Sequence, residues 1–277
     1  MKTNSPFTTR EFICGWLAAS TNIIITYPLS KISIQQVLHN ESLLKASKYN
    51  VVRRSSPRDM YRGLLPPLCQ KSLSVSFMFG AYYNIHNYLI TKNVKYANHL
   101  SIFALGIIET MIMPFERIQS ILVNRDFNKK YKNMIQLMIT LPQEYGFKEC
   151  YRGMNMVLLR NILGTGFFFN LKNTSDFYIS ESYKLPVIQS AAQFVLGGII
   201  GAFISTCLYP LSVIKLEMQK PIGTKFVSPI KVMVEIYSRK GKFMEFYKGG
   251  VINAVRAFFS WGIINTSYET YMKWFFE

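Results

Sequence analysis

Four ionisable side chains interrupt apolar stretches of this 277-residue chain and are its first candidates for chemistry: Lys71, Glu109, Arg160 and Arg256. An ionisable group inside a membrane-length apolar segment is costly, so it usually faces a protein-lined or watery interior. An arginine guanidinium donates pairs of parallel N–H hydrogen bonds that match the oxygens of a phosphate. With three of these side chains positive and one negative, the set carries a surplus of two positive charges, which suits an anionic ligand.

The sequence shows no pattern typical of catalysis or of a metal site. No nucleophile has a neighbouring base and orienting group, and no Walker-type phosphate loop occurs. Neither the cysteines nor the histidines have the spacing of metal ligands or of a disulfide framework; they are Cys14, Cys69, Cys150 and Cys207, and His39, His86 and His99. These observations argue against an enzyme and against a bound metal.

The candidate residues lie within a pattern that the chain repeats three times. An apolar run ends in a proline, and an aromatic–base–glycine segment then begins 33, 37 and 37 residues later in the successive copies. A unit of about ninety residues is too long for an ordinary solenoid repeat, but it has room for two membrane-length helices and a connection. We therefore divide the chain into repeats of residues 1–96, 97–186 and 187–277. The pattern consists of Pro28 and Tyr61–Gly63, Pro114 and Tyr151–Gly153, and Pro210 and Tyr247–Gly249.

The net charge of +17 is spread unevenly along the sequence. Basic residues crowd into residues 45–58, 125–148 and 220–242, whereas residues 12–29, 100–115 and 191–211 contain no lysine or arginine. Such asymmetry is typical of a membrane protein whose basic loops lie on the negatively charged side. Nucleic-acid binding is the alternative for a strongly basic chain. We disfavour it because the charges alternate with apolar segments and form no single stripe.

These patterns predict an all-α membrane protein with six transmembrane helices in three pseudo-symmetric repeats around a central cavity. The odd-numbered helices should be kinked at Pro28, Pro114 and Pro210, because an interior proline removes a backbone hydrogen bond and clashes with the preceding turn. The six helices are expected over residues 11–37, 66–89, 98–123, 155–178, 187–219 and 252–275, with short connecting helices over 41–53, 131–145 and 229–239. An even number of spans would place both termini on one side.

The repeats resemble the mitochondrial carrier family over essentially the whole chain. The family signature is Pro-x-acid-x-x-base, and each copy here is degenerate: Ser30 and Ser33 in the first, Glu116 and Gln119 in the second, and Ser212 and Lys215 in the third. Residues 61–71, 114–119 and 260–265 are similar to the NAD transporter subgroup of that family. This resemblance implies an inner-membrane carrier that imports NAD into the matrix by alternating access. It also implies that the short helices face the matrix and both termini face the intermembrane space.

The resemblance also implies the residues that bind substrate. Family members contact substrate seven residues beyond the glycine of each aromatic–base–glycine segment, which here gives Gln70, Arg160 and Arg256, with Lys71 and Asn161 as neighbours. The two arginines would bind the pyrophosphate of NAD, which is cargo and not a cofactor. A structural alternative is that both arginines only form hydrogen bonds between helices.

Two further interactions are expected from the positions and chemistry of the residues themselves. Lys71 is expected to pair with Glu109 across the cavity, because each charge alone would be costly there. Met111, Met113 and residues 167–169 could shelter a ring of the substrate, although packing or lipid contact is the simpler reading of such side chains.

The family also implies a gate at each end of the cavity. In the matrix gate, Glu116 and Lys215 would form the single ion pair, Ser30 would meet Gln119, and Ser212 would meet Ser33. Gln219, nine residues after Pro210, would act as a glutamine brace. In the cytoplasmic gate, Glu269 retains the family acid, with His86 as its partner.

Two other functions stay open from the sequence. One is a carrier for a different anionic cofactor or nucleotide, such as coenzyme A or a thiamine pyrophosphate-like compound. The other is a non-transporting membrane scaffold with decayed gates, which the central charged residues disfavour because a protein without a cavity would gain nothing from them. The expected partners are NAD or a related dinucleotide and inner-membrane lipids such as cardiolipin, with no nucleic acid, and the expected state is a monomer.

Overall fold

The computed structural model describes residues 9–51, 57–77, 83–92, 94, 97–164, 166–167, 186–239 and 242–276. Every regular element in these ranges is helical, so the all-α prediction is confirmed for the described part of the chain. The first half contains α1 (Thr9–Leu38), α2 (Leu43–Val51), α3 (Pro57–Met60), α4 (Leu65–Phe77), α5 (Tyr83–Thr91), α6 (Ala97–Met111) and α7 (Met113–Val123). The second half contains α8 (Met134–Tyr145), a helix over residues 154–164, α10 (Pro186–Cys207), α11 (Tyr209–Gln219), α12 (Pro229–Ser238) and α13 (Gly250–Phe276).

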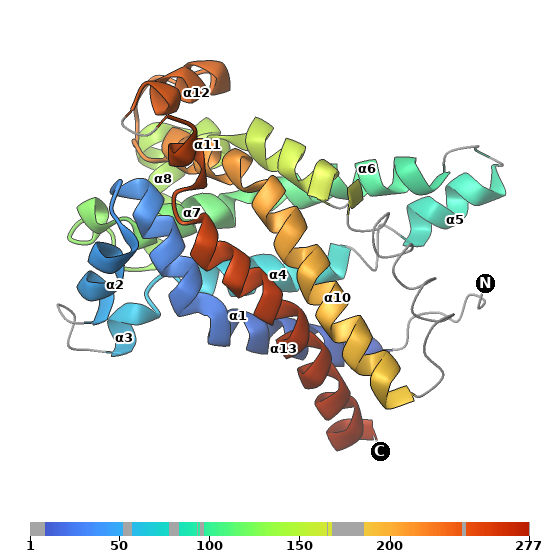
Figure 1. Cartoon of the computed structure of the whole chain (residues 1–277). Helices are drawn as coiled ribbons and strands as arrows, with labels where there is room; N and C mark the ends of the chain where they lie inside the picture. The colour runs from blue at the N-terminus through green and yellow to red at the C-terminus, as the bar shows by residue number, and fades with distance from the viewer. Residues whose placement is uncertain are drawn as a thin grey trace.

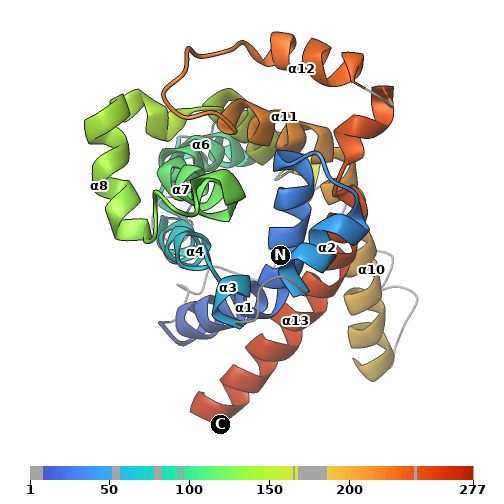
Figure 2. The same cartoon turned by 90° about the vertical axis from the view of Figure 1, so that its left-hand side faces the viewer.

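The long helices surround a common centre. Viewed end-on in Figure 2, α1, α4, α7, α11 and α13 form a ring, and α8 and α12 lie outside it. The helix α13 packs against both α1 and α10, so the last repeat closes onto the first. The short helices α2, α3, α8 and α12 gather at one end of the bundle (Figure 1), as the three connecting segments of a repeat protein should.

The three prolines have different effects on their helices. Pro114 and Pro210 are each the second residue of a new helix, α7 or α11, after breaks at Ile112 and Leu208. The described parts of α10 and α11 meet at an angle of 49°. Proline is tolerated at such a first-turn position because its missing N–H would have no partner there in any case. Pro28 instead lies inside the continuous α1, which changes direction along its length (Figures 1 and 2).

The tyrosines before two of these prolines hold the helix that follows in the same repeat. The Tyr27 hydroxyl donates to the carbonyl of Arg62 over 2.6 Å, and the Tyr209 hydroxyl donates to the carbonyl of Lys248 over 2.8 Å. The glycine after each acceptor has a positive φ, +86° at Gly63 and +83° at Gly249, which side chains rarely adopt. A β-carbon would lie only 2.7 Å from the Tyr27 oxygen or 2.5 Å from the Tyr209 oxygen. The aromatic–base–glycine segments of the first and third repeats are therefore places where the chain passes close to the tyrosine of the preceding helix.

Length and hydropathy alone identify fewer than six spans among the described residues. The stretch Phe12–Leu38 of α1 qualifies, and Val195–Cys207 with Tyr209–Gln219 would form a second, broken span. Of the other predicted spans, the one over residues 98–123 separates into α6 and α7 at Ile112, and the one over 252–275 lies within the continuous α13. The predicted spans over 66–89 and 155–178 include residues outside the described ranges. The six-span arrangement therefore stays a prediction.

Candidate functional site

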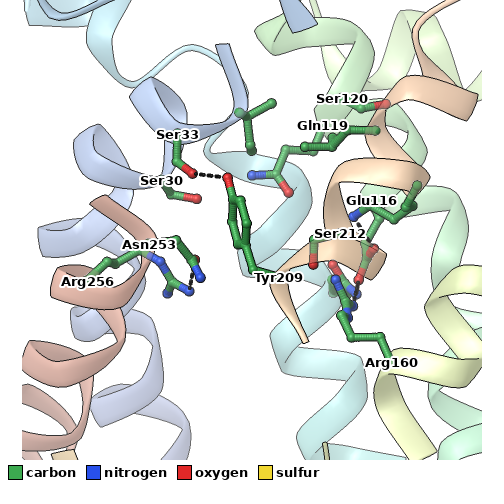
Figure 3. Close-up of a pocket in the computed structure, with 14 residues that line it drawn as sticks. Ser30, Ser33, Glu116, Gln119, Ser120, Arg160, Tyr209, Ser212, Asn253 and Arg256 are labelled. Atoms are coloured by element: carbon green, nitrogen blue, oxygen red, sulfur yellow. Dashed lines mark hydrogen bonds and ion pairs between the residues drawn. The ribbon is translucent and has the colours of Figure 1, made fainter. Parts of the chain in front are cut away.

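Three adjoining hollows in the centre of the bundle contain all six residues predicted to bind substrate. The first is lined by Gln70, Arg160 and Arg256 (Figure 3), the second by Glu109, Asn161 and both arginines, and the third by Lys71 with Gln70, Glu109 and Asn161. Arg160 lines all three and joins them. The second hollow alone has a volume of about 360 Å³, which is within the range of small-ligand sites.

The Glu116 carboxylate is the most heavily bonded group in this cavity. Its Oε2 accepts from the Lys215 ammonium over 2.9 Å, which is the ion pair expected from the sequence. Its Oε1 accepts from Arg160 over 2.9 Å and from Gln70 over 3.0 Å. Two predicted substrate contacts are thus bonded to a predicted gate residue, and Glu116 has two cationic partners where the sequence analysis expected one.

Arg256 has a different environment on the opposite wall. Its guanidinium donates to Asn253 Oδ1 over 3.0 Å, and Asn253 Nδ2 donates to Ser205 Oγ over 2.6 Å. No carboxylate pairs with Arg256 in the described part of the chain. Figure 3 shows Arg256 and Arg160 entering the cavity from opposite sides, with the Tyr209 ring between them.

Tyr209 and Asn253 line the cavity although the sequence analysis did not select them. Asn253 could have been found, because it lies three residues before Arg256 and therefore on the same face of α13. Tyr209 had a visible but different signal, its position before Pro210. Its hydroxyl lies 3.0 Å from Ser33 Oγ, and this contact joins the first and third repeats.

The other expected matrix-gate contacts differ from the prediction. Ser30, Ser33, Gln119 and Ser212 all line the first hollow, but no hydrogen bond between described residues joins Ser30 to Gln119 or Ser212 to Ser33. Ser33 instead contacts the Tyr209 hydroxyl and donates to the carbonyl of Gly249 over 3.0 Å. A serine side chain is too short to span the distance of a lost acid–base pair.

The role of Gln219 as a glutamine brace stays a prediction, and its described hydrogen bonds go to residues outside the Glu116–Lys215 pair. The side-chain amide N–H of Gln219 donates to the backbone carbonyl of Arg152 over 3.0 Å. The backbone carbonyl of Gln219 accepts from the Arg117 guanidinium. Gln219 holds the start of the helix over residues 154–164 and has no hydrogen bond to Glu116 or Lys215.

Lys71 and Glu109 share a hollow, but the predicted ion pair between them is not formed. Glu109 accepts a hydrogen bond from the Ser74 hydroxyl over 3.1 Å, and no salt bridge joins it to Lys71, both being among the described residues. Ser74 is one turn after Lys71 on α4, so the nearer neutral donor takes the carboxylate.

The cytoplasmic gate lies outside the described side chains. The backbone of His86 belongs to α5 and that of Glu269 to α13, and their pairing stays a prediction. Of the residues proposed to shelter a ring, Met113 is buried, whereas Met111 and Phe167 are exposed, and residues 168 and 169 are outside the described residues.

A buried charge cluster that the sequence analysis missed lies at the end of the bundle that carries the short helices. Glu149 is bonded by Arg117 over 2.5 Å and by Arg152 over 2.8 Å. Arg117 also donates to the carbonyl of Pro221 over 2.9 Å, and Arg152 donates to the carbonyl of Thr224. The cluster attaches the second repeat to the segment between α11 and α12.

One titratable group just outside the proposed spans is shifted by its surroundings. Burial, and then the nearby charge of Arg125, lower the pKa of His39 below its ordinary value. The backbone N–H of Arg125 lies 3.3 Å from Nε2 of His39 and donates to it, which requires the neutral ring. The Arg125 guanidinium also pairs with Glu41 over 2.7 Å, so this contact links the ends of the first helices of two repeats.

Comparison with known proteins tests the family directly. The family model for mitochondrial carrier protein matches residues 4–93, 96–182 and 187–277. A mitochondrial nicotinamide adenine dinucleotide transporter of Mus musculus is 35% identical over 273 residues, which cover 95% of this chain and 89% of the relative. Another from Homo sapiens is 34% identical over 272 residues with the same coverage. Solute carrier family 25 member 53 of Homo sapiens is 25% identical over 270 residues, covering 94% of this chain and 86% of the relative.

The family resemblance found in the sequence is therefore confirmed. The matches span nearly all of the chain, and they occur once in each of three consecutive segments. This chain belongs to the mitochondrial carrier family, whose members are multi-pass transporters of the mitochondrial inner membrane and not enzymes.

Proposed function

We propose that this chain imports NAD into the mitochondrial matrix by alternating access. The observation that carries the proposal is that Arg160 and Arg256 reach one cavity from opposite walls, where they can each bind a phosphate of a pyrophosphate group. Relatives that are NAD transporters, at 35% and 34% identity, support this substrate above other anions.

The charge of the cavity agrees with a dinucleotide. NAD carries two negative phosphates and one positive nicotinamide ring. The three cations Lys71, Arg160 and Arg256 can face the two phosphates, and the anion Glu109 can face the nicotinamide, which leaves one positive charge in excess. Gln70 and Asn161 can form hydrogen bonds with a ribose hydroxyl or an amide.

The proposed transport cycle uses the contacts between repeats. The Glu116–Lys215 pair and the Ser33–Tyr209 contact hold α7, α11 and α1 together at the end with the short helices. We propose that these contacts close the matrix side, that the chain spans the membrane six times, and that both termini face the intermembrane space. The division at residues 96/97 and 186/187, a monomeric state and contacts with inner-membrane lipids belong to the same proposal.

Uptake into proteoliposomes tests the substrate. Purified full-length protein should accumulate radiolabelled NAD, and unlabelled NAD should compete far better than nicotinamide or adenosine, which lack the pyrophosphate. Coenzyme A and thiamine pyrophosphate belong in the same panel, because two arginines could bind any pyrophosphate. Preferential uptake of either would replace NAD as the substrate, and equal competition by nicotinamide would remove the arginines from the mechanism.

A further inference from the structure

Glu116 places a carboxylate where the phosphate of a ligand would have to bind. Its Oε1 accepts from Arg160 over 2.9 Å, and its Oε2 accepts from Lys215 over 2.9 Å. We infer that Glu116 is a built-in competitor of the substrate phosphate for Arg160, so that substrate binds by exchanging an ion-pair partner. The inference rests on the proposed function only in taking a phosphate-bearing ligand as the substrate.

The two cations bonded to Glu116 differ in how well a ligand can reach them. The Arg160 side chain is 27% exposed and lines all three hollows, whereas Lys215 is 11% exposed and lines only one. A ligand that enters the cavity therefore meets Arg160 with part of its guanidinium free. The remaining N–H groups can donate to one phosphate oxygen before the bond to Glu116 breaks.

This arrangement explains how the cavity keeps two arginines without a ligand. A buried cation with no partner is strongly destabilising. Arg160 is neutralised by Glu116, whereas Arg256 has the neutral partner Asn253. The two arginines are thus unequal: a phosphate can bind Arg256 directly, but it must displace a carboxylate at Arg160. The exchange lowers the net affinity, which allows a carrier to release its cargo.

Removal of Lys215 should have the opposite effect on binding from removal of Glu116. Lys215 and Arg160 are like charges that share one carboxylate, so each weakens the hold of Glu116 on the other. Without Lys215, Glu116 holds Arg160 more strongly and phosphate binding weakens. Without the Glu116 charge, Arg160 is released and phosphate binding becomes tighter.

The experiment measures binding of inorganic pyrophosphate and of NAD to the purified full-length protein by calorimetry. Glu116→Gln should tighten pyrophosphate binding by about tenfold or more, the size expected for one charge-assisted hydrogen bond. Glu109→Gln is the matched control: it removes the same charge from the same cavity, but the described partner of Glu109 is Ser74. The affinity of the Glu109→Gln variant for pyrophosphate should rise by about threefold or less, because only long-range electrostatics changes. Equal gains for the two variants would overturn the inference.

A double-mutant cycle isolates the contact. The gain in pyrophosphate affinity from Glu116→Gln should disappear in an Arg160→Gln background and persist in an Arg256→Gln background. Of the two described arginines of the cavity, Arg160 is bonded to Glu116 and Arg256 to Asn253. A gain that survives in the Arg160→Gln background contradicts the inference. Lys215→Met should weaken pyrophosphate binding, and this variant keeps the test decisive if Glu116→Gln does not fold; tighter binding would contradict the inference.

The two ligands separate this inference from the proposed function. If the variants change pyrophosphate binding as expected and NAD is not transported, the assignment of NAD as substrate fails, but the competition between Glu116 and phosphate for Arg160 is supported. If NAD is transported and Glu116→Gln does not tighten pyrophosphate binding, the proposed competition for Arg160 fails, but the assignment of NAD as substrate does not.

Discussion

Lys215 and Glu116, from the third and second repeats, form an ion pair of 2.9 Å in which each side chain is only 11% exposed. Because Arg160 bonds the same carboxylate, the two halves of the pair are not equivalent. Lys215→Met leaves Glu116 with a cation, whereas Glu116→Gln leaves two cations without their anion.

Glu116→Gln should therefore destabilise the protein more than Lys215→Met. We expect a loss of about 3 kcal/mol for the first, as when a buried pair is broken, and about 1 kcal/mol for the second. Thermal unfolding of the detergent-purified variants measures the order. A larger loss for Lys215→Met would show that Arg160 does not compensate for the lysine.

Protonation of His39 should destabilise the protein as pH falls. Its pKa is lowered in the folded state, mainly by burial and then by Arg125, so near and below its ordinary value the unfolded chain binds more protons. Stability is then complete above about pH 6.5 and decreases as the pH falls from there toward the folded pKa.

The measurement is the thermal unfolding midpoint between pH 5.5 and 8. His39→Gln can still accept the Arg125 backbone N–H through its amide oxygen but does not titrate, so its midpoint should vary less with pH. An unchanged pH dependence in this variant would assign the effect to other groups.

The sequence contained more about the repeats than about the site. Each proline and each aromatic–base–glycine segment acts through local backbone chemistry, so the helices could be placed from single residues such as Pro114 and Gly63. The break at Leu208 was missed because a proline in an apolar run predicts a kink without deciding whether the helix continues.

The site was predicted residue by residue, but its bonding was not. The spacing from Gly153 identified Arg160, and the proline motif identified Glu116. No sequence pattern, however, predicted that these two residues form an ion pair with each other. Such contacts depend on side-chain distances across helices, and so does the choice of Ser74 as the partner of Glu109. Family roles assign each residue one partner, whereas a carboxylate can accept several donors.

Glu109→Gln should alter binding of NAD more than folding. The bond from Ser74 can be kept by the glutamine oxygen, so the cost in stability should be small. Affinity for NAD should fall because the negative charge can face the nicotinamide cation, while affinity for pyrophosphate should not fall. Ser74→Ala is the control that removes the hydrogen bond and keeps the charge. Unchanged NAD kinetics in Glu109→Gln would exclude Glu109 from the site.

The proposed topology places Lys129 and Lys92 on opposite sides of the membrane. Both are exposed, Lys129 near the short helices and Lys92 after α5. Single cysteines at these positions, in a background where the exposed Cys207 is serine, should react with an impermeant thiol reagent from opposite sides: position 92 in mitoplasts and position 129 in inside-out inner-membrane vesicles. Labelling of both from one side would contradict the six-span arrangement. The basic residues Arg53 and Lys240 and the opposing Lys95 and Lys184 lie outside the described residues.

Substitution of the two arginines should reduce transport in a graded order. Lysine keeps the charge but loses the planar pair of donors, and alanine loses both, so uptake should fall from wild type to Arg160→Lys to Arg160→Ala. One lost charge-assisted hydrogen bond should weaken binding about tenfold to a hundredfold. Uptake should fall in the same order at Arg256. Arg256→Ala should lose more transport than Arg160→Ala, because no described carboxylate competes with the substrate for Arg256. Initial uptake rates over a range of NAD concentrations measure the change, and Lys231→Ala, an exposed cation on α12, is the control. If both alanine variants purify folded and transport NAD at the wild-type rate, the arginines do not bind the substrate.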